Sequence, residues 1–498
     1  MIGAVRVLQR IKQNVYELVC RKGYEYRFLM KPTGILAVVY MLAVSAILRA
    51  NYYYHDDIQR ACWGWPNWGF SRHVSNLLSK FLHAGSYLTD ISPLPQILAV
   101  LVIALASVLC IYLITGKKEI SLWQLIAAVP IGISPYFLEC LSFKYDAPYM
   151  ALSVFFAVVP LLLSRKKWYL YVFGVAAGTV AMSSSYQASS GIFPMLVIVM
   201  GICRWSKGEE LRKVLQFYMV SAAAFLLGLL VYRTFFMEAL NAYATTELAF
   251  ESGLISTAIF NYKRYIVHFL QGFNLWWLVA AFVICLCFLW TVVRCSKQNK
   301  LLTFVLTGAA MVVMFALAFG VYPFLVEPLF YPRAMYGIGC FIAFQGIYAV
   351  SEGTKGIVAR GVSLMLAWGF FVFALTFGNA LGVQAQYTDF RIMEVIDDLS
   401  ECDTLLSEDT TLQITGSIGY APGVESMLDS YPMIGKLVPV TFQGDGWWGE
   451  FGIRYYYDLP EFRFAETYDP PEKEMPLVTE NYYHTIRADD HYIWVDLH

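Results

Sequence analysis

Between residues 34 and 380 the chain alternates long apolar runs with short polar breaks. Every second break is basic, at residues 116–119, 165–167, 204–213, 294–300 and 355–360, and the breaks between them carry acids, aromatics, Gly and Pro. Lys and Arg concentrate on the cytoplasmic side of membrane proteins. The alternation therefore predicts a chain that crosses a bilayer repeatedly, with its basic turns inside and its acidic and aromatic segments outside.

Charge is scarce and unevenly placed. The 498 residues are 58% hydrophobic and 15% charged, which is too apolar for an ordinary soluble protein of this size. Residues 389–498 hold 22 acidic and six basic side chains, so the rest of the chain is net basic. A basic face beside anionic lipid explains this excess better than nucleic-acid binding does. We expect contact with membrane lipid and none with nucleic acid.

A helix needs about 20 apolar residues to cross the hydrocarbon core. This length predicts a polytopic α-helical membrane protein with about 11 transmembrane helices, at residues 34–49, 94–115, 122–137, 149–163, 169–182, 192–202, 215–232, 275–293, 301–319, 336–350 and 362–377. Basic residues precede the first run, so it reads as a retained anchor, not a cleaved signal peptide, with the N-terminus in the cytoplasm. Eleven spans then place the C-terminus outside.

Three regions follow from this reading. Residues 1–33 form a basic amphipathic arm on the cytoplasmic side, residues 34–380 the transmembrane domain, and residues 381–498 a small extracytoplasmic α/β domain. Within the last region, 389–399 has helical spacing, whereas 412–415 and 437–440 are strand candidates.

The ten cysteines include no CxxC pair and no zinc spacing. Cys62, Cys140 and Cys402 fall on the predicted outer side, and whether any two of them form a disulfide is left open.

The first outer segment carries the adjacent acids Asp56 and Asp57. Two neighbouring carboxylates repel each other, which favours retention of a proton by one of them. One could serve as general base for an acceptor hydroxyl. Arg60, one helical turn later, could hold a carboxylate ionised or bind a phosphate. A solvated acidic cap is the simpler alternative, and a divalent cation on His55, Asp56 and Asp57 would need further ligands.

The other outer segments offer cations and hydroxyl-rich stretches. Lys144 is a phosphate-contact candidate with Asp146 as its partner, or else an interfacial Lys whose stem is buried. Tyr186 and Gln187 lie in a Ser-rich stretch that suits hydrogen bonding to a sugar, although small residues also mediate helix packing.

Near residue 330 the outer segment carries Glu327 and Arg333. The planar donor fork of an arginine suits a lipid phosphate. An ion pair between Arg333 and Glu327 is the competing interpretation.

Together, several short motifs resemble the GtrII-type glucosyltransferases of bacterial membranes, in the GT-C class. The motifs are Asp56-Asp57-Ile58-Gln59-Arg60, Ser92-Pro93-Leu94-Pro95-Gln96, Leu141-Ser142-Phe143-Lys144-Tyr145-Asp146, Ser185-Tyr186-Gln187-Ala188 and Pro332-Arg333. Their order and their shared outer placement carry the resemblance.

The resemblance implies a plasma-membrane enzyme with a GT-C-like catalytic domain. It would move glucose from a polyprenyl-phosphate carrier to an outer-face glycan such as O-antigen or a wall polymer, with inversion. It would work beside a polyprenyl-phosphate glucose synthase and a flippase. No cofactor is implied with certainty, and a divalent cation is left open.

The same resemblance assigns roles to residues. Asp56 would be the base, with Asp57 as co-base or orienting group. The donor phosphate would contact Arg333, Lys144, Arg60 and Arg72. Contacts to the sugar or acceptor would come from His55, Asp146, Tyr186, Gln187 and Glu327.

Two other classes compete with this hypothesis. A transporter or lipid-linked-sugar flippase would keep ionisable groups near the bilayer midplane, whereas the spans here are almost free of charge. A non-catalytic assembly protein would use the C-terminal region as a binding module. Within the enzyme class, another hexose from a lipid carrier remains an alternative.

Overall fold

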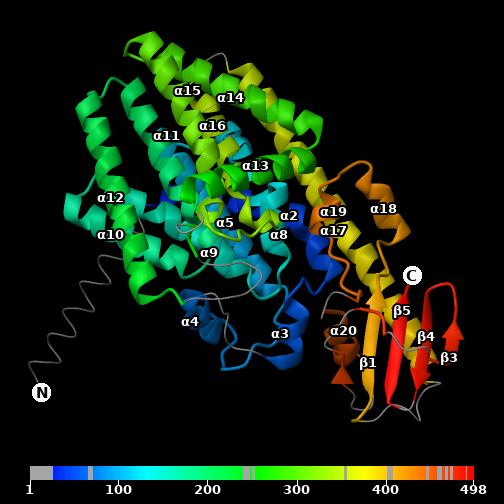
Figure 1. Cartoon of the computed structure of the whole chain (residues 1–498). Helices are drawn as coiled ribbons and strands as arrows, with labels where there is room; N and C mark the ends of the chain where they lie inside the picture. The colour runs from blue at the N-terminus through cyan, green and yellow to red at the C-terminus, as the bar shows by residue number, and fades with distance from the viewer. Residues whose placement is uncertain are drawn as a thin grey trace, which may run out of the picture.

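The computed structural model describes residues 26–64, 71–238, 247–249, 253–352, 356–400, 408–444, 448–456, 463–465, 469–471, 475–489 and 491–498. Most of the predicted N-terminal arm lies outside these residues. A large helical body is joined through α17 to a small sheet at the C-terminal end of the chain (Figure 1).

Seven helices in the described part of the chain are long and apolar enough to cross a membrane. They are η1–α2 (Arg27–Ala50), α5 (Leu94–Thr115), η3–α11 (Gln187–Ser206), α12 (Leu211–Phe235), α14 (Leu275–Cys295), α15 (Lys300–Leu317) and α17 (Ile357–Ser400).

An eighth segment is broken. Helices α6 (Leu122–Ala128) and α7 (Pro130–Ile133) are followed by α8 (Pro135–Ser142), with a bend of 57° between the two halves. Pro130 and Pro135 lack the N–H that a continuous helix would use, which accounts for the break. The segment is either one bent span or a re-entrant loop.

Three shorter apolar helices complete the body: α9–η2 (Ala147–Leu163), α10 (Trp168–Ser183) and α16 (Gly337–Ser351). Each of the eleven predicted spans falls on one of these helical segments. Seven or eight of them reach spanning length, so the structure does not establish the predicted count of about eleven.

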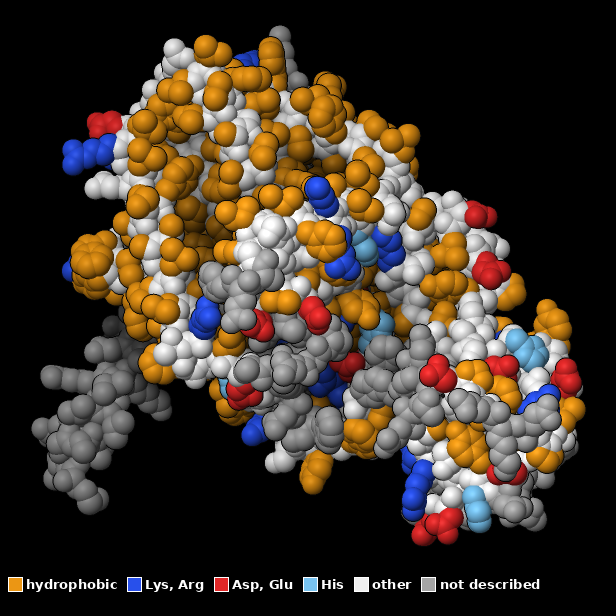
Figure 2. All heavy atoms as spheres, viewed as in Figure 1, with side chains coloured by type: hydrophobic (Ala, Val, Ile, Leu, Met, Phe, Trp, Pro, Cys, Tyr) orange, Lys and Arg blue, Asp and Glu red, His pale blue; other side chains and the backbone are white. Residues whose placement is uncertain are grey.

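Hydrophobic side chains cover much of the helical body on the face shown in Figure 2. Large hydrophobic side chains are exposed along several of its helices, among them Leu230 on α12, Trp290 on α14 and Val312 on α15. An apolar surface of this extent would be unstable in water, and it is the surface that lipid covers in a membrane protein.

Helices α2 and α17 pack closely. A Cβ atom at Gly378 would lie 2.5 Å from the Ala46 carbonyl carbon and closer still to the Ile47 nitrogen. Both neighbours are backbone atoms, so the helices would have to separate to admit a side chain.

We expect Gly378→Ala to lower the free energy of unfolding by about 1–3 kcal/mol because it forces these helices apart. Gly361 is the matched control, since it lies on the same helix and a Cβ atom there would have no neighbour within 4 Å. Gly361→Ala should be neutral or stabilise by up to about 1 kcal/mol. Denaturant unfolding of the purified protein in detergent measures both, and equal effects would contradict the close packing.

The C-terminal sheet has the strand order β2-β1-β5-β4-β3. The strands are β1 (Thr411–Gly416), β2 (Arg463–Phe464), β3 (Leu477–Glu480), β4 (His484–Asp489) and β5 (Tyr492–Leu497). Strand β1 is parallel to β2 and β5, whereas β4 is antiparallel to β3 and β5. Alternate residues of β4 and β5 are buried, and they form one core with Ile392, Val395 and Leu399 of α17.

The helix predicted at 389–399 and the strand predicted at 412–415 are confirmed as parts of α17 and β1. The strand predicted at 437–440 is wrong. Leu437 ends the short helix α19 (Ile434–Leu437), and residues 438–440 join no strand. Leu437 and Val438 are buried in the core of the helical body, with Val424 of α18 (Pro422–Leu428), so their hydrophobicity reflects packing there.

Short helices gather at the end of the body that carries the first predicted outer segment. Helices α3 (Asp57–Trp63) and α4 (His73–Leu82) lie beneath the body in Figure 1, and α20 (Trp448–Tyr456) lies between α3 and the sheet. The Trp63 and Phe451 rings meet edge to face at 4.8 Å, and the Tyr53 and Tyr455 hydroxyls are 2.9 Å apart. The C-terminal region therefore contacts the segment that holds Asp56. Helix α13 (Leu254–Gly272) belongs to the helical body (Figure 1).

Candidate active site

The two adjacent acids occupy different environments. Helix α2 ends at Ala50 and is followed by Asn51 in a left-handed conformation, and α3 begins at Asp57. Asp57 is fully buried, and its Oδ2 accepts the backbone N–H groups of Tyr54 at 3.2 Å and Lys144 at 2.8 Å. Its Oδ1 has no hydrogen-bond partner among the described residues. This carboxyl thus fastens the first segment to the connection between α8 and α9 (Ala147–Val158).

Burial raises the pKa of Asp57 well above its ordinary value, and the nearby Asp146 raises it further. The backbone hydrogen bonds and Arg60 oppose this shift without cancelling it. Asp56 is different, because 39% of its side chain is exposed and its Oδ2 lies 3.9 Å from the Arg60 Nη2. Of the two acids, Asp56 is the one that an incoming molecule can reach.

Arg60 and Arg72 share one carboxylate. The Asp146 Oδ2 lies 3.3 Å from the Arg60 Nη2, and its Oδ1 accepts from the Arg72 Nη1 at 2.8 Å. All three side chains are largely buried. With Asp56 near Arg60, the group holds two guanidiniums and two carboxylates.

Lys144 is buried and pairs with Asp90, and not with the predicted partner Asp146, which pairs with the two arginines. Its Nζ donates to the Asp90 Oδ2 at 2.9 Å and lies 3.6 Å from the Tyr53 ring centroid. Burial alone would raise the pKa of Asp90, but hydrogen bonds from Ser92 and Lys144 outweigh it and lower the pKa to about 2. Asp90 was not predicted as a site residue. Its place just before the Ser92–Gln96 motif was the signal that could have identified it.

Arg333 pairs with Glu139 and not with the predicted alternative, Glu327. Its backbone N–H and its Nη1 both donate to the buried Glu139 carboxylate, and its guanidinium stacks 4.4 Å from the Tyr331 ring centroid. Glu327 is exposed. Glu139 lies inside α8, and sequence reasoning gave it no role because its partner comes from a segment almost 200 residues away.

His55 points toward the same carboxylate, with its Nε2 4.0 Å from the Glu139 Oε1. Burial and then the charge of Arg333 lower the pKa of His55 to about 3, so the ring is neutral near pH 7. His55 thus faces Glu139 while Asp57 faces Lys144, and the three consecutive residues do not converge on one point. In the described part of the chain, no group of three or more His, Cys, Asp or Glu side chains could hold a metal ion.

Tyr186 and Gln187 lie beside the arginine pair. The Arg72 guanidinium lies 5.0 Å from the Tyr186 ring centroid, and the buried Tyr186 hydroxyl has no hydrogen-bond partner among the described residues. The Gln187 side chain donates to the Tyr232 hydroxyl at 2.8 Å.

Of the three cysteines predicted to lie outside, Cys62 and Cys140 are free thiols, and Cys402 lies outside the described residues.

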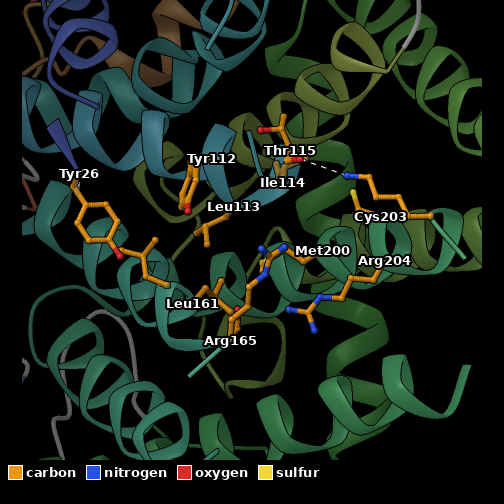
Figure 3. A pocket seen from close by; sticks show the side chains of 14 residues that line it. Tyr26, Tyr112, Leu113, Ile114, Thr115, Leu161, Arg165, Met200, Cys203 and Arg204 are labelled. Atoms are coloured by element: carbon orange, nitrogen blue, oxygen red, sulfur yellow. Dashed lines mark hydrogen bonds between the residues drawn. The ribbon is translucent and has the colours of Figure 1, made fainter. Parts of the chain in front are cut away.

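Two cavities adjoin the first segment and share Asn51 and Tyr52 in their walls. One has a volume of about 290 Å³ and is lined by Ser92, Gln96 and Lys144, among others. Gln96 is buried, and its Oε1 has no hydrogen-bond partner in the described structure. The other cavity, of about 200 Å³, borders Thr388 and Asp389 of α17. Neither Asp56 nor Asp57 lines them. A third cavity lies at the far end of α5 (Figure 3).

Helix α20, which packs on α3, holds an acid with a shifted pKa. Burial raises the pKa of Glu450 from 4.5 to about 7, although Arg454 opposes the shift. The folded protein therefore binds this proton more tightly than the unfolded chain does. Stability from this group is present below pH 4.5 and is lost as the pH rises toward 7.

We expect the unfolding midpoint of the wild-type protein to fall between pH 5 and 8 with a slope that Glu450→Gln reduces. Thermal unfolding across this range measures the slope. Glu425→Gln is the control, since Glu425 is exposed on α18 and its replacement should keep the wild-type slope. An identical slope in Glu450→Gln would show that Glu450 does not titrate there.

The predicted outer segments thus meet at one end of the helical body, in three ion-paired groups around the first segment. A relative from Salmonella phage P22, described as an uncharacterized 55.3 kDa protein in the gtrB 5′ region, is 22% identical over 430 residues, which is 83% of this chain and 87% of the relative. No solved structure matches. The family model described as glucosyl transferase GtrII matches residues 45–348, and because this is more than half of the chain, the protein belongs to the GtrII glucosyltransferase family.

Proposed function

We propose that the protein transfers glucose from a polyprenyl-phosphate carrier to a cell-envelope glycan at the outer membrane surface, with inversion at the sugar. Membership of the GtrII family supports the glucosyl transfer. The observation that carries the site is the accessible carboxylate of Asp56 beside the Arg60–Asp146–Arg72 group. The family match gives the transporter alternative no support.

The proposed reaction is a single displacement. The acceptor hydroxyl gives its proton to the Asp56 carboxylate as its oxygen bonds to the anomeric carbon of glucose. The bond between that carbon and the carrier phosphate breaks, and its electron pair leaves with the polyprenyl phosphate. Negative charge develops on the leaving phosphate, where fixed guanidinium donors stabilise it.

Position relative to Asp56 separates the four predicted phosphate contacts. Lys144 and Arg333 are each paired with a carboxylate, Asp90 and Glu139, and we assign them to positioning the segments. Arg60 lies 3.9 Å from Asp56 and shares the Asp146 carboxylate with Arg72. We favour Arg60 and Arg72 as the donor-phosphate contacts because they lie beside the proposed base.

Burial and hydrogen bonding likewise divide the two acids. Asp57 is buried and held by two backbone N–H groups, so we assign it to orienting the segment that presents Asp56. We assign the sugar hydroxyls of the donor or acceptor to the 290 Å³ cavity, because the buried Gln96 amide oxygen has no hydrogen-bond partner there among the described residues and could accept one from a sugar. The contacts predicted for His55, Asp146, Tyr186, Gln187 and Glu327 remain predictions, as do the partner synthase and flippase.

The test is glucose transfer by the purified protein in nanodiscs. It would receive radiolabelled polyprenyl-phosphate glucose or radiolabelled UDP-glucose, with a panel of cell-envelope glycans as acceptors. We expect label in a glycan from the lipid donor only. Transfer from UDP-glucose alone would refute the carrier assignment, and transfer of another lipid-linked hexose in its place would refute glucose. Parallel reactions with and without EDTA test the divalent cation.

A further inference from the structure

The cavity shown in Figure 3 lies far from Asp56 and the ion-paired groups around it. It is lined by residues at the C-terminal ends of α5 and α11 (Ile192–Ser206), whereas Asp90 and Ser92 precede the N-terminal end of α5. Helix α5 has 22 residues, so the two ends are about 33 Å apart. This distance is about the thickness of the hydrocarbon core, which places the cavity at the opposite face of the helical body.

Basic breaks of the sequence meet at this cavity. Its lining includes Gly116 from the first break, Arg165 from the second, and Arg204 and Lys207 from the third. None of the described residues that line it is acidic. The alternation read from the sequence thus corresponds to a concave, positively charged site.

One of the three cations is compensated. The Lys207 Nζ donates to the Thr115 carbonyl at 3.4 Å and lies 3.9 Å from the Glu352 Oε1. Glu352 is shared with Lys117, whose Nζ is 3.3 Å away. The carbonyl at the end of α5 and the Glu352 carboxylate therefore satisfy the hydrogen bonding and the charge of the Lys207 ammonium group.

The two arginines differ from Lys207. Neither guanidinium has a hydrogen bond or an ion pair within the described residues. Figure 3 shows the Arg204 head group beside the Arg165 side chain in the cavity, where the two charges repel each other, and the charge of Glu209 opposes this repulsion. The Arg204 guanidinium stacks on the Phe217 ring at 3.9 Å from its centroid. Stacking occupies the face of the guanidinium and leaves its in-plane N–H donors available.

The cavity has a volume of about 110 Å³, which admits a phosphate with its four oxygens. Leu113, Leu161 and Met200 supply apolar walls. The two arginine forks in its lining provide several in-plane donors, which suits an anion with several oxygens, as a phosphate has.

We propose that Arg165 and Arg204 form a phosphate-binding site at this face, separate from the transfer site and filled either by the phosphodiester of an anionic lipid or by a free phosphate. The anion accepts hydrogen bonds from the in-plane donors of both guanidiniums. The apolar walls allow the acyl chains of a lipid to continue along α5 and α11.

The test measures thermal unfolding of the full chain in a neutral detergent with added phosphatidylglycerol, phosphatidylcholine or inorganic phosphate. We expect phosphatidylglycerol to stabilise the wild type more than phosphatidylcholine does. In the double variant Arg165→Gln/Arg204→Gln, the apparent affinity for phosphatidylglycerol should fall about tenfold or more, the loss expected for charge-assisted hydrogen bonds. Lys213→Gln removes an exposed cation of the third basic break and should retain the wild-type response.

The arms separate the sources of the phosphate. If inorganic phosphate stabilises the wild type and abolishes the response to phosphatidylglycerol, a free phosphate fills the site. If inorganic phosphate neither stabilises the wild type nor abolishes its response to phosphatidylglycerol, the lipid fills the site. Equal responses to both lipids together with none to phosphate overturn the proposal on the wild type alone. An unchanged response in the double variant also overturns it. If the double variant cannot be purified, Arg165→Lys takes its place. It keeps the charge but loses the planar fork, so it should bind phosphatidylglycerol less tightly than the wild type does.

Discussion

Asp56→Asn is expected to reduce the turnover of sugar transfer by about 10²–10⁴-fold, the usual contribution of a positioned general base. The amide is nearly the same size as the carboxylate but cannot take the acceptor proton. Asp56 is partly exposed and makes no hydrogen bond to the backbone of its own helix, so the fold should tolerate the change. The measurement is the initial rate with labelled polyprenyl-phosphate glucose, at donor concentrations that separate kcat from KM.

Two controls make this result specific. Asp429→Asn changes an exposed acid far along the chain from the first segment and should leave the rate unchanged. Asp57→Asn should lower the stability as well as the rate, because the Asp57 Oδ2 holds two backbone N–H groups. If Asp56→Asn kept the wild-type kcat while Asp57→Asn abolished turnover in a folded sample, the roles of the two acids would have to be exchanged.

Glu139→Gln is expected to lower the free energy of unfolding by about 3–5 kcal/mol, the cost of breaking a buried ion pair from one side. Glu139 is fully buried and accepts both the backbone N–H and the guanidinium of Arg333. Without the carboxylate, the arginine keeps a buried charge that water cannot reach. Denaturant unfolding in nanodiscs measures the loss.

An exposed ion pair provides the control. Glu210→Gln breaks the contact with Lys213, in which both side chains are mostly exposed, and should cost no more than about 1 kcal/mol. Glu139→Leu combined with Arg333→Met removes both charges and should recover most of the stability. An equally large loss in the double variant would indicate that packing, and not the unpaired charge, explains the effect.

The sequence predicted the large features because they depend on local pattern. Apolar runs placed the membrane helices, and alternating residues placed β1. The strand expected at 437–440 was wrong because an apolar run of four residues does not distinguish a strand from a turn packed on a helix. Because α6–α8 break at Pro130 and Pro135 and three further helices are short, the eleven apolar runs do not correspond to eleven helices of spanning length.

Ion pairing was harder to predict for a different reason. Arg60, Arg72 and Asp146 were all identified individually, but their pairing depends on how three separate segments meet. Glu139 and Asp90 were not identified, because a single acid in a sequence carries no sign of its partner. The placing of Arg60 and Arg72 beside Asp56, and of Lys144 beside Asp90, is a property of the folded chain.

Helix α17 continues for 44 residues, from within the helical body to the core of the C-terminal sheet. At 1.5 Å per residue it is about 66 Å long, roughly twice the thickness of a hydrocarbon core. A continuous helix cannot act as a hinge, so α17 fixes the distance between the helical body and the sheet. For a glycan bound by that sheet, the length of α17 would therefore set the distance between its reactive hydroxyl and Asp56.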